Sequence, residues 1–225
     1  AIVRSPQGRL FVADKTGRIQ RFGPGGEVEK VWRTPVYKAG MPVGMGLAPD
    51  GRLFVADTHY NRVLVYSQEG ELLDQFGKAG RGDGEFEMPT DVVVDADGYV
   101  YVSETGGNDR ISKFDPQFQY IKSFGSAEQG EAATCRPVGM TLAADGTLWV
   151  ADAVNHRLAQ FTREGRFVKA IGTSGNEPGR FRYPYDTAEL PDGTLVVAEF
   201  GNNRLQQVTT DGRSVRTWGG AGWHV

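Results

Sequence analysis

Carboxylic acids and arginines recur along this chain at a spacing that is compatible with ion pairing. An acid is followed four to six residues later by an arginine at five places: Asp14–Arg18, Asp57–Arg62, Glu104–Arg110, Asp152–Arg157 and Glu199–Arg204. Catalytic constellations are seldom copied at every repeat of a chain, whereas ion pairs can be. We therefore interpret these residues as structural pairs that hold a hairpin together.

Two other aspartates differ from this pattern, because they replace glycine in a recurring context. Asp91 and Asp186 each stand two residues after a proline, where other copies of the segment have Gly44 and Gly139. Each aspartate can accept backbone N–H bonds beside its proline. Alternatively, the two can hold a metal ion or another polar ligand, since carboxylate oxygens are ligands for divalent cations.

Histidine is scarce, and its positions do not require a metal centre. His59 and His156 occupy different places in their loops, and His224 is close to the last residue. Three histidines from separate loops can converge on zinc, but their spacing does not predict it. The single cysteine, Cys135, has no partner for an internal disulfide, and we expect it to be inert.

Aromatic and amide side chains also stand in or next to the loop segments. They include Asn108, Tyr60, Tyr183, Tyr185 and Phe200. Aromatic rings in surface loops suit contact with peptides, sugars or unpaired bases. We expect Tyr183 to pack between repeats, as Met88 would. The candidate binding residues are Asp91, Asp186, His59, Tyr60, Asn108, His156, Tyr185 and Phe200.

The elements that must position these residues are copies of one unit. A glycine that opens an apolar run recurs at positions 8, 51, 98, 146 and 193. A period of 40 to 50 residues indicates a repeat architecture. In the second copy, short β-patterned runs over 42–48, 53–57, 62–66 and 72–76 are separated by turn residues, and we denote them strands a to d.

Four antiparallel strands at this period are typical of a β-propeller blade, so we predict an all-β fold with about five blades. The predicted blades cover residues 1–41, 42–88, 89–136, 137–183 and 184–225 of a single domain, 1–225. In such a blade the b–c and d–a loops emerge on one face. These loops vary between copies, whereas the a–b and c–d turns are short and uniform. Variable loops on a rigid scaffold usually bind ligands. Strand a lies beside the central channel, which places Asp91 and Asp186 near the channel mouth.

The repeat resembles the NHL repeat. The resemblance rests on the proline that opens strand a, on the Asp-Gly turn, and on segments such as Asn61-Arg62, Asn155-His156-Arg157 and Asn202-Asn203-Arg204. It covers essentially the whole chain, with a first copy that lacks the proline. NHL propellers usually have six blades. The resemblance therefore implies a part of a six-bladed ring, or five blades in an open or tightened ring.

The resemblance implies a binding scaffold whose loop face takes a protein or a small polar ligand. The alternative is a metal-dependent propeller enzyme that uses zinc or calcium. The segment 89–115 resembles a blade of the peptidyl-hydroxyglycine lyases, but Val138 and Tyr185 stand where those enzymes would carry a histidine. A lactonase-like calcium site would instead use Asp91, Asp186, Glu104 and Glu199.

Composition narrows the classes of partner. The net charge is −3 and the basic residues are dispersed, which disfavours nucleic acid as a ligand. No apolar run reaches the 18 residues typical of a membrane span. The sequence leaves the compartment and the oligomeric state open.

Overall fold

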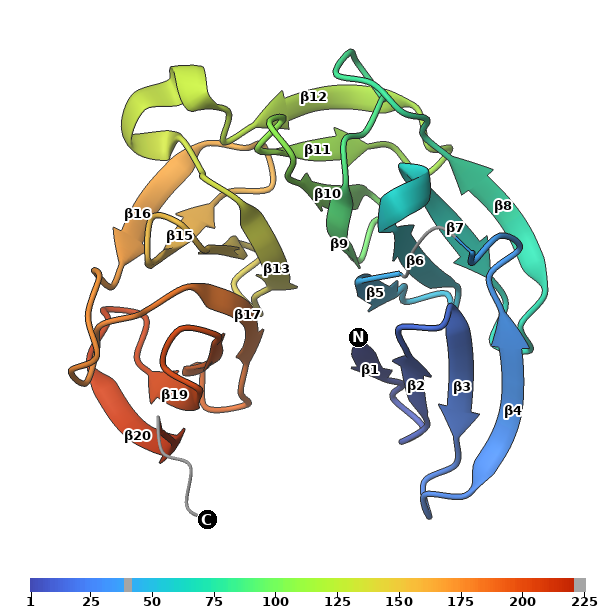
Figure 1. Cartoon of the computed structure of the whole chain (residues 1–225), viewed down its shortest axis with the longest axis horizontal. Coiled ribbons are helices and arrows are strands. Elements are labelled where there is room, and N and C mark those ends of the chain that lie inside the picture. Colours follow the sequence, from blue (N-terminus) through green and yellow to red (C-terminus); the bar gives the residue numbers. More distant parts are fainter. Residues whose placement is uncertain (39–41, 221–225) are drawn as a thin grey trace. The chain divides into compact units, whose positions relative to one another are not determined.

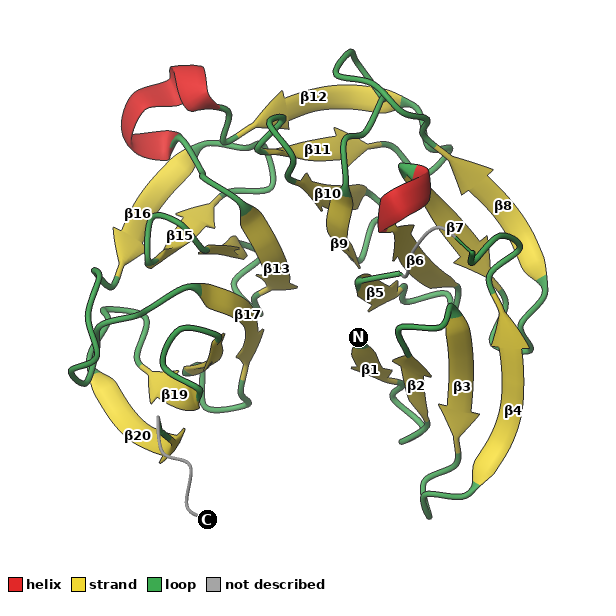
Figure 2. Ribbon diagram, viewed as in Figure 1, coloured by secondary structure: helices red, strands yellow, loops and turns green. Residues whose placement is uncertain are grey.

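The computed structural model describes residues 1–38 and 42–220, and it consists almost entirely of β-strands (Figure 1). The strands form five four-stranded antiparallel sheets, and within each sheet the strands are paired in chain order. The predicted propeller architecture, with five blades, is confirmed. Two short 3-10 helices, η1 (Thr58–Tyr60) and η2 (Ala127–Ala132), lie in loops between strands (Figure 2).

The five blades each contain strands a to d in chain order. Blade 1 comprises β1 (Ile2–Arg4), β2 (Leu10–Ala13), β3 (Arg18–Phe22) and β4 (Val28–Arg33). Blade 2 comprises β5 (Gly44–Leu47), β6 (Leu53–Asp57), β7 (Arg62–Tyr66) and β8 (Leu72–Phe76). Blade 3 comprises β9 (Pro89–Val94), β10 (Val100–Glu104), β11 (Arg110–Phe114) and β12 (Tyr120–Phe124). Blade 4 comprises β13 (Pro137–Leu142), β14 (Leu148–Asp152), β15 (Arg157–Phe161) and β16 (Phe167–Ile171). Blade 5 comprises β17 (Pro184–Glu189), β18 (Leu195–Glu199), β19 (Arg204–Val208) and β20 (Ser214–Gly219).

Residue contacts divide the chain into two compact units, Ala1–Lys122 and Ser123–Val225. The predicted single domain over 1–225 stays a prediction. Within the first unit, strand a of blade 2 contacts strand a of blades 1 and 3. Within the second unit, strand a of blade 4 contacts strand a of blade 5.

In blade 2 the middle strands are buried on both faces, because this blade packs against blades 1 and 3. In β6, Leu53 and Val55 join an apolar cluster with blade 1, whereas Phe54 and Ala56 join a cluster with blade 3. Successive side chains of a strand point to opposite faces, so a strand that is covered on both sides must be apolar throughout. The last strand of this blade, β8, is largely exposed.

The turns follow the chemistry that the sequence predicts. Gly51 adopts a φ of +88° at the a–b turn of blade 2, and its N–H donates to the carbonyl of Ala48. The Asp50 carboxylate accepts the N–H of Arg52 at 3.0 Å. A positive φ favours glycine, and aspartate satisfies turn N–H groups two residues ahead. Strand a of this blade, expected from Pro42, begins at Gly44, although the Val43 N–H still donates to Ala56.

Candidate functional site

The acid–arginine pairs are ion pairs at the ends of strands b and c. Each arginine Nε donates to the acid of its own hairpin, at 2.9 Å for Arg62–Asp57, 2.7 Å for Arg110–Glu104, 2.7 Å for Arg157–Asp152 and 2.6 Å for Arg204–Glu199. These four acids are buried. The pair in blade 1, Arg18 with Asp14, is solvent-accessible.

Arg110, Arg157 and Arg204 also tie their hairpins to the d–a loop that precedes the blade. Arg110 Nη2 donates to the carbonyls of Gly82 and Glu85, both at 3.0 Å. Arg204 Nη2 donates to the carbonyl of Arg180 at 2.8 Å. Sequence reasoning predicted a clasp across one hairpin and missed this link. The loop that receives the bonds lies more than 20 residues upstream, and carbonyl acceptors carry no sequence signature.

The second carboxylate oxygen of the acid also accepts hydrogen bonds, as Glu104 shows. Glu104 Oε2 accepts the backbone N–H of Glu87 at 3.0 Å and the side-chain amide of Asn108 at 2.7 Å. Asn202 donates to Glu199 Oε2 in the same way, whereas Asn155 donates to Asp152 Oδ2, the oxygen that also accepts Arg157 Nε. Burial raises the pKa of Glu104, and the hydrogen bond from Arg110 opposes that effect. The amide of Asn108, a predicted binding residue, is therefore engaged within the hairpin.

His156 fills a position that asparagine holds in another blade. Its Nδ1 accepts the backbone N–H of Tyr183 at 3.1 Å, just as Asn61 Oδ1 accepts that of Met88 at 2.8 Å. Both acceptors have a left-handed backbone, with φ of +55° for His156 and +52° for Asn61. An Nδ1 that accepts a bond carries no proton, so His156 presents its Nε2–H tautomer. The Tyr183 ring meets the imidazole edge-on, with centroids 4.6 Å apart, although the tyrosine stays exposed.

Asp91 and Asp186, which lie in strand a of blades 3 and 5, each face a glycine of the preceding blade. A Cβ atom on Gly44 would lie 2.4 Å from Asp91 Cα, and one on Gly139 would lie 2.2 Å from Asp186 Oδ1. The alternation of glycine and aspartate in the sequence thus has a steric cause, because the inner strands approach too closely for a second side chain. The replacement of glycine by aspartate at this repeat position, which suggested a site, therefore also reflects the packing of the inner strands.

Asp186 retains solvent access, yet the protein around it displaces enough water to raise the pKa of its carboxyl. The N–H of Thr187 donates to Asp186 Oδ1 at 2.8 Å and opposes this shift. A carboxylate that is held where ionisation is costly is a candidate for a functional role.

The predicted metal ligands are dispersed. Over residues 1–38 and 42–220, no three His, Cys, Asp or Glu side chains lie close enough together to hold a metal ion. His59 is exposed in η1, and His224 lies outside the described residues. Glu104 and Glu199, candidates for a lactonase-like site, are engaged with Arg110 and Arg204.

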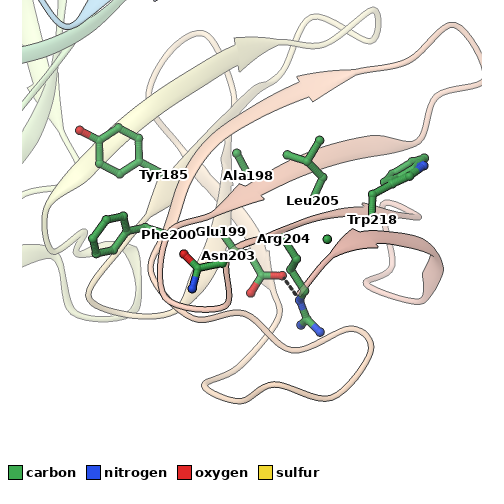
Figure 3. A pocket seen from close by; sticks show the side chains of 9 residues that line it. Tyr185, Ala198, Glu199, Phe200, Asn203, Arg204, Leu205 and Trp218 are labelled. Atoms are coloured by element: carbon green, nitrogen blue, oxygen red, sulfur yellow. Dashed lines mark hydrogen bonds and ion pairs between the residues drawn. The ribbon is translucent and has the colours of Figure 1, made fainter. Parts of the chain in front are cut away.

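Aromatic side chains on and beside the loops range from half-buried Tyr60 to exposed Phe200. Tyr60 packs under the Arg62 guanidinium, 5.4 Å from its ring centroid. Phe200 is 72% exposed and Tyr185 47% exposed. Both line an open pocket of about 620 Å³ on blade 5, which Figure 3 shows. Its other lining residues are Ala198, Glu199, Asn203, Arg204, Leu205, Trp218 and Gly219.

Two family models match the chain over separate segments. A model described as a 6-bladed beta-propeller matches residues 47–125, and an NHL repeat model matches residues 134–161. The two segments cover blades from both units, and the repeat positions that they share carry the ion pairs described above. The chain is a β-propeller built from NHL repeats.

The NHL propeller is similar to proteins with different descriptions. It is 28% identical over 170 residues to mouse NHL repeat-containing protein 3, covering 68% of this chain and 48% of that protein. It is 27% identical over 150 residues to a probable peptidyl-alpha-hydroxyglycine alpha-amidating lyase of Caenorhabditis elegans, covering 60% of this chain and 41% of the lyase. The chain spans less than half the length of each of these two relatives.

Solved structures share the fold of the NHL propeller. A streptogramin B lyase superposes with a TM-score of 0.74 at 15% identity, covering 99% of this chain and 68% of that one. At this identity the likeness concerns the fold alone. Among the described residues, no helix has the length and apolar character needed to cross a membrane.

Proposed function

We propose that this NHL propeller is a binding scaffold that takes a protein or a small polar ligand on its b–c and d–a loops. The observation that supports this function is that the loop residues fall into two groups, one engaged within the protein and one accessible at its surface. The charged residues that recur in the blades are engaged with one another and with the d–a loops. The residues that differ between blades, such as Phe200 and Tyr60, leave aromatic surface on the loops.

Exposed aromatic rings beside buried, fixed polar groups are suited to recognition. Aromatic side chains bury large areas on binding and lose few rotatable bonds, so they dominate protein interfaces. The hydrogen bonds from Arg110, Arg157 and Arg204 fix the d–a loops in place, which lowers the entropy lost when a partner binds.

The experiment is a selection of peptides from a random dodecapeptide library on the immobilised chain. We expect selected peptides to bind Tyr60→Ala or Phe200→Ala at least about tenfold more weakly than the unchanged chain. Tyr99→Ala, an aromatic change at an a–b turn, serves as the matched control and should keep the affinity. Peptides that are insensitive to Tyr60 and Phe200 but lost in Tyr99→Ala would contradict the proposal.

A metal-dependent enzyme is the second candidate. It is favoured by the carboxyl of Asp186, whose pKa is raised by burial, and by the similarity to an amidating lyase. Elemental analysis of the purified chain tests it. Stoichiometric zinc or calcium that is lost in both Asp91→Asn and Asp186→Asn would favour this candidate over a scaffold.

A further inference from the structure

Two d–a loops of this chain have the same length and the same structure. Residues 77–88 lead into blade 3, and residues 172–183 lead into blade 5. Each loop folds back on itself through an isolated parallel bridge, Ala79 with Phe86 and Ser174 with Phe181. Both phenylalanines are fully buried. The shared sequence is Gly-x-Phe-x-x-Pro, at 84–89 and 179–184.

Each of these phenylalanines fills a socket on the preceding blade. Phe86 belongs to one apolar cluster with Ala56 and Val63 of blade 2, and its ring centroid lies 6.2 Å from that of Phe76. Phe181 belongs to the corresponding cluster with Ala151, Leu158 and Ile171 of blade 4. The glycine after strand d is required, because a Cβ on Gly77 or Gly172 would lie 2.2 Å from the phenylalanine ring.

A hydrogen bond sets the position of the loop in the socket. The backbone N–H two residues after the phenylalanine donates to a left-handed residue at the b–c turn of the preceding blade. These bonds are Met88 to Asn61 and Tyr183 to His156. The socket therefore recognises an aromatic ring and a backbone N–H at a fixed separation.

Blade 5 carries every element of this socket. Ala198, Leu205 and Trp218 stand at the positions of Ala56, Val63 and Phe76 in blade 2, and Gly219, at the position of Gly77, ends strand d with a φ of +79°. Asn203 has the left-handed backbone of Asn61, with a φ of +49°. These five residues line the pocket of about 620 Å³ in Figure 3.

Blade 5 differs from blades 2 and 4 in what covers the residues of the socket. Val63 and Leu158 are fully buried by their phenylalanine loops, whereas Leu205 is 43% exposed. The three atoms nearest to a Cβ on Gly219 would belong to Asn203 and Arg204, whereas those nearest to a Cβ on Gly77 or Gly172 belong to the phenylalanine ring. The backbone of the socket is thus formed in blade 5 without a loop to fill it among the described residues.

We propose that the blade 5 pocket is a recognition site for a Gly-x-Phe-x-x-Pro segment, namely the d–a loop of a further blade of the same NHL type. The phenylalanine would enter between Leu205 and Trp218, and the N–H two residues later would donate to Asn203 Oδ1. A second copy of the chain cannot supply Phe86 or Phe181 while it is folded, because both rings are buried. The pocket shares Phe200 with the proposed loop-face function, but the test below depends on Leu205 and on Phe86 of the peptide.

The probe is a fluorescein-labelled peptide that corresponds to residues 77–94, and the measurement is its anisotropy on titration with the full chain. We expect saturable binding that weakens at least about tenfold when Phe86 of the peptide is replaced by serine. We expect the same loss with Leu205→Asp in the chain. Val215→Asp is the matched control, because Val215 is exposed on β20 but does not line the pocket.

Circular dichroism and the Tm must agree between the two variants, so that a loss of binding is not a loss of fold. Equal binding of the serine peptide, an unchanged affinity in Leu205→Asp, or no binding up to about 1 mM would each overturn the proposal. Self-association in sedimentation velocity that Leu205→Asp abolishes, without peptide binding, would overturn it in favour of a second copy as the occupant.

Discussion

Arg110 and Arg18 hold the same repeat position, but only Arg110 lies in the protein interior. The Arg110 side chain is 10% exposed and its partner Glu104 is fully buried, whereas the Arg18 side chain is 44% exposed. Burial removes water that would otherwise solvate an unpaired charge. The same substitution should therefore have very different consequences at the two positions.

We predict that Arg110→Met lowers the free energy of unfolding by about 3–5 kcal/mol, because it leaves the Glu104 carboxylate buried without its charged partner. Arg18→Met, the matched change, should cost no more than about 1 kcal/mol. Urea unfolding followed by circular dichroism gives both values. Equal losses would show that the buried pair contributes nothing beyond an exposed one.

A second residue-scale prediction concerns Asp186 and pH. Its pKa is raised in the folded chain, so the folded state holds this proton more tightly than the unfolded state does. Stability from this group is full below the ordinary aspartate pKa and is lost as the pH rises through the raised value. Asp186→Asn removes the titration and should gain stability relative to the unchanged chain as the pH increases.

Urea unfolding of both proteins from pH 4 to pH 8 measures this difference. A constant difference across the series would mean that Asp186 has the same pKa in both states. A difference that grows toward acid would reverse the sign of the argument.

The sequence predicted the residue types of the pairs but not their second partners. The spacing of Asp57 and Arg62 is local, so a hairpin pair follows from it directly. The bonds of Arg110 to a distant loop depend on the packing of one blade against the next. His156 is a predicted binding residue whose Nδ1 accepts the backbone N–H of Tyr183, and this donor could not be predicted from spacing alone.

At the scale of elements, each d–a loop is both a connection and a packing unit. Phe181 is buried against blade 4, which precedes it in the chain. The carbonyl of the adjacent Arg180 accepts a hydrogen bond from Arg204 of blade 5. A single loop therefore contributes to the cohesion of two blades.

We predict that Phe181→Ala lowers the free energy of unfolding by about 3–5 kcal/mol, because it leaves a cavity in the socket of blade 4. Phe200→Ala, a change of the same chemistry at a ring that is 72% exposed, should alter stability by no more than about 0.5 kcal/mol. Thermal unfolding of the two variants gives the comparison. Similar shifts in Tm would contradict the socket description.

Strand positions were easier to predict than loop contacts. All five c strands begin at the predicted arginine, and the a strands of blades 3, 4 and 5 begin at their prolines. Period-two alternation and turn residues are local signals. Phe86 and Phe181 gave no such signal, because their loops lack periodicity. Their common place three residues before a proline could have indicated a shared role, although Thr134 stands there before blade 4.

At the scale of the whole molecule, stability should vary across each blade in the same way. Strands β6 and β14 are buried along their full length, whereas β8 and β20 are mostly exposed. In a repeat protein each unit is stabilised by its neighbours, so the strands with the most buried contacts open least often.

We predict that hydrogen exchange is slowest in β6, β7 and β14 and fastest in β4, β8 and β20. Exchange measured by mass spectrometry on peptic fragments of the native chain resolves these segments. Uniform protection across the four strands of a blade would show that blades open as single units. Faster exchange in b strands than in d strands would contradict the burial argument.

The phenylalanine that closes a blade is encoded after that blade, and this order has a consequence during synthesis. Blade 2 ends at Phe76, but its socket stays uncovered until the ribosome has released residue 86. The growing chain therefore displays an apolar hollow on blade 2, and later on blade 4, and each hollow disappears only when the following loop emerges. Any slowing of translation between those two points would prolong the time in which nascent chains can stick to one another or recruit a chaperone.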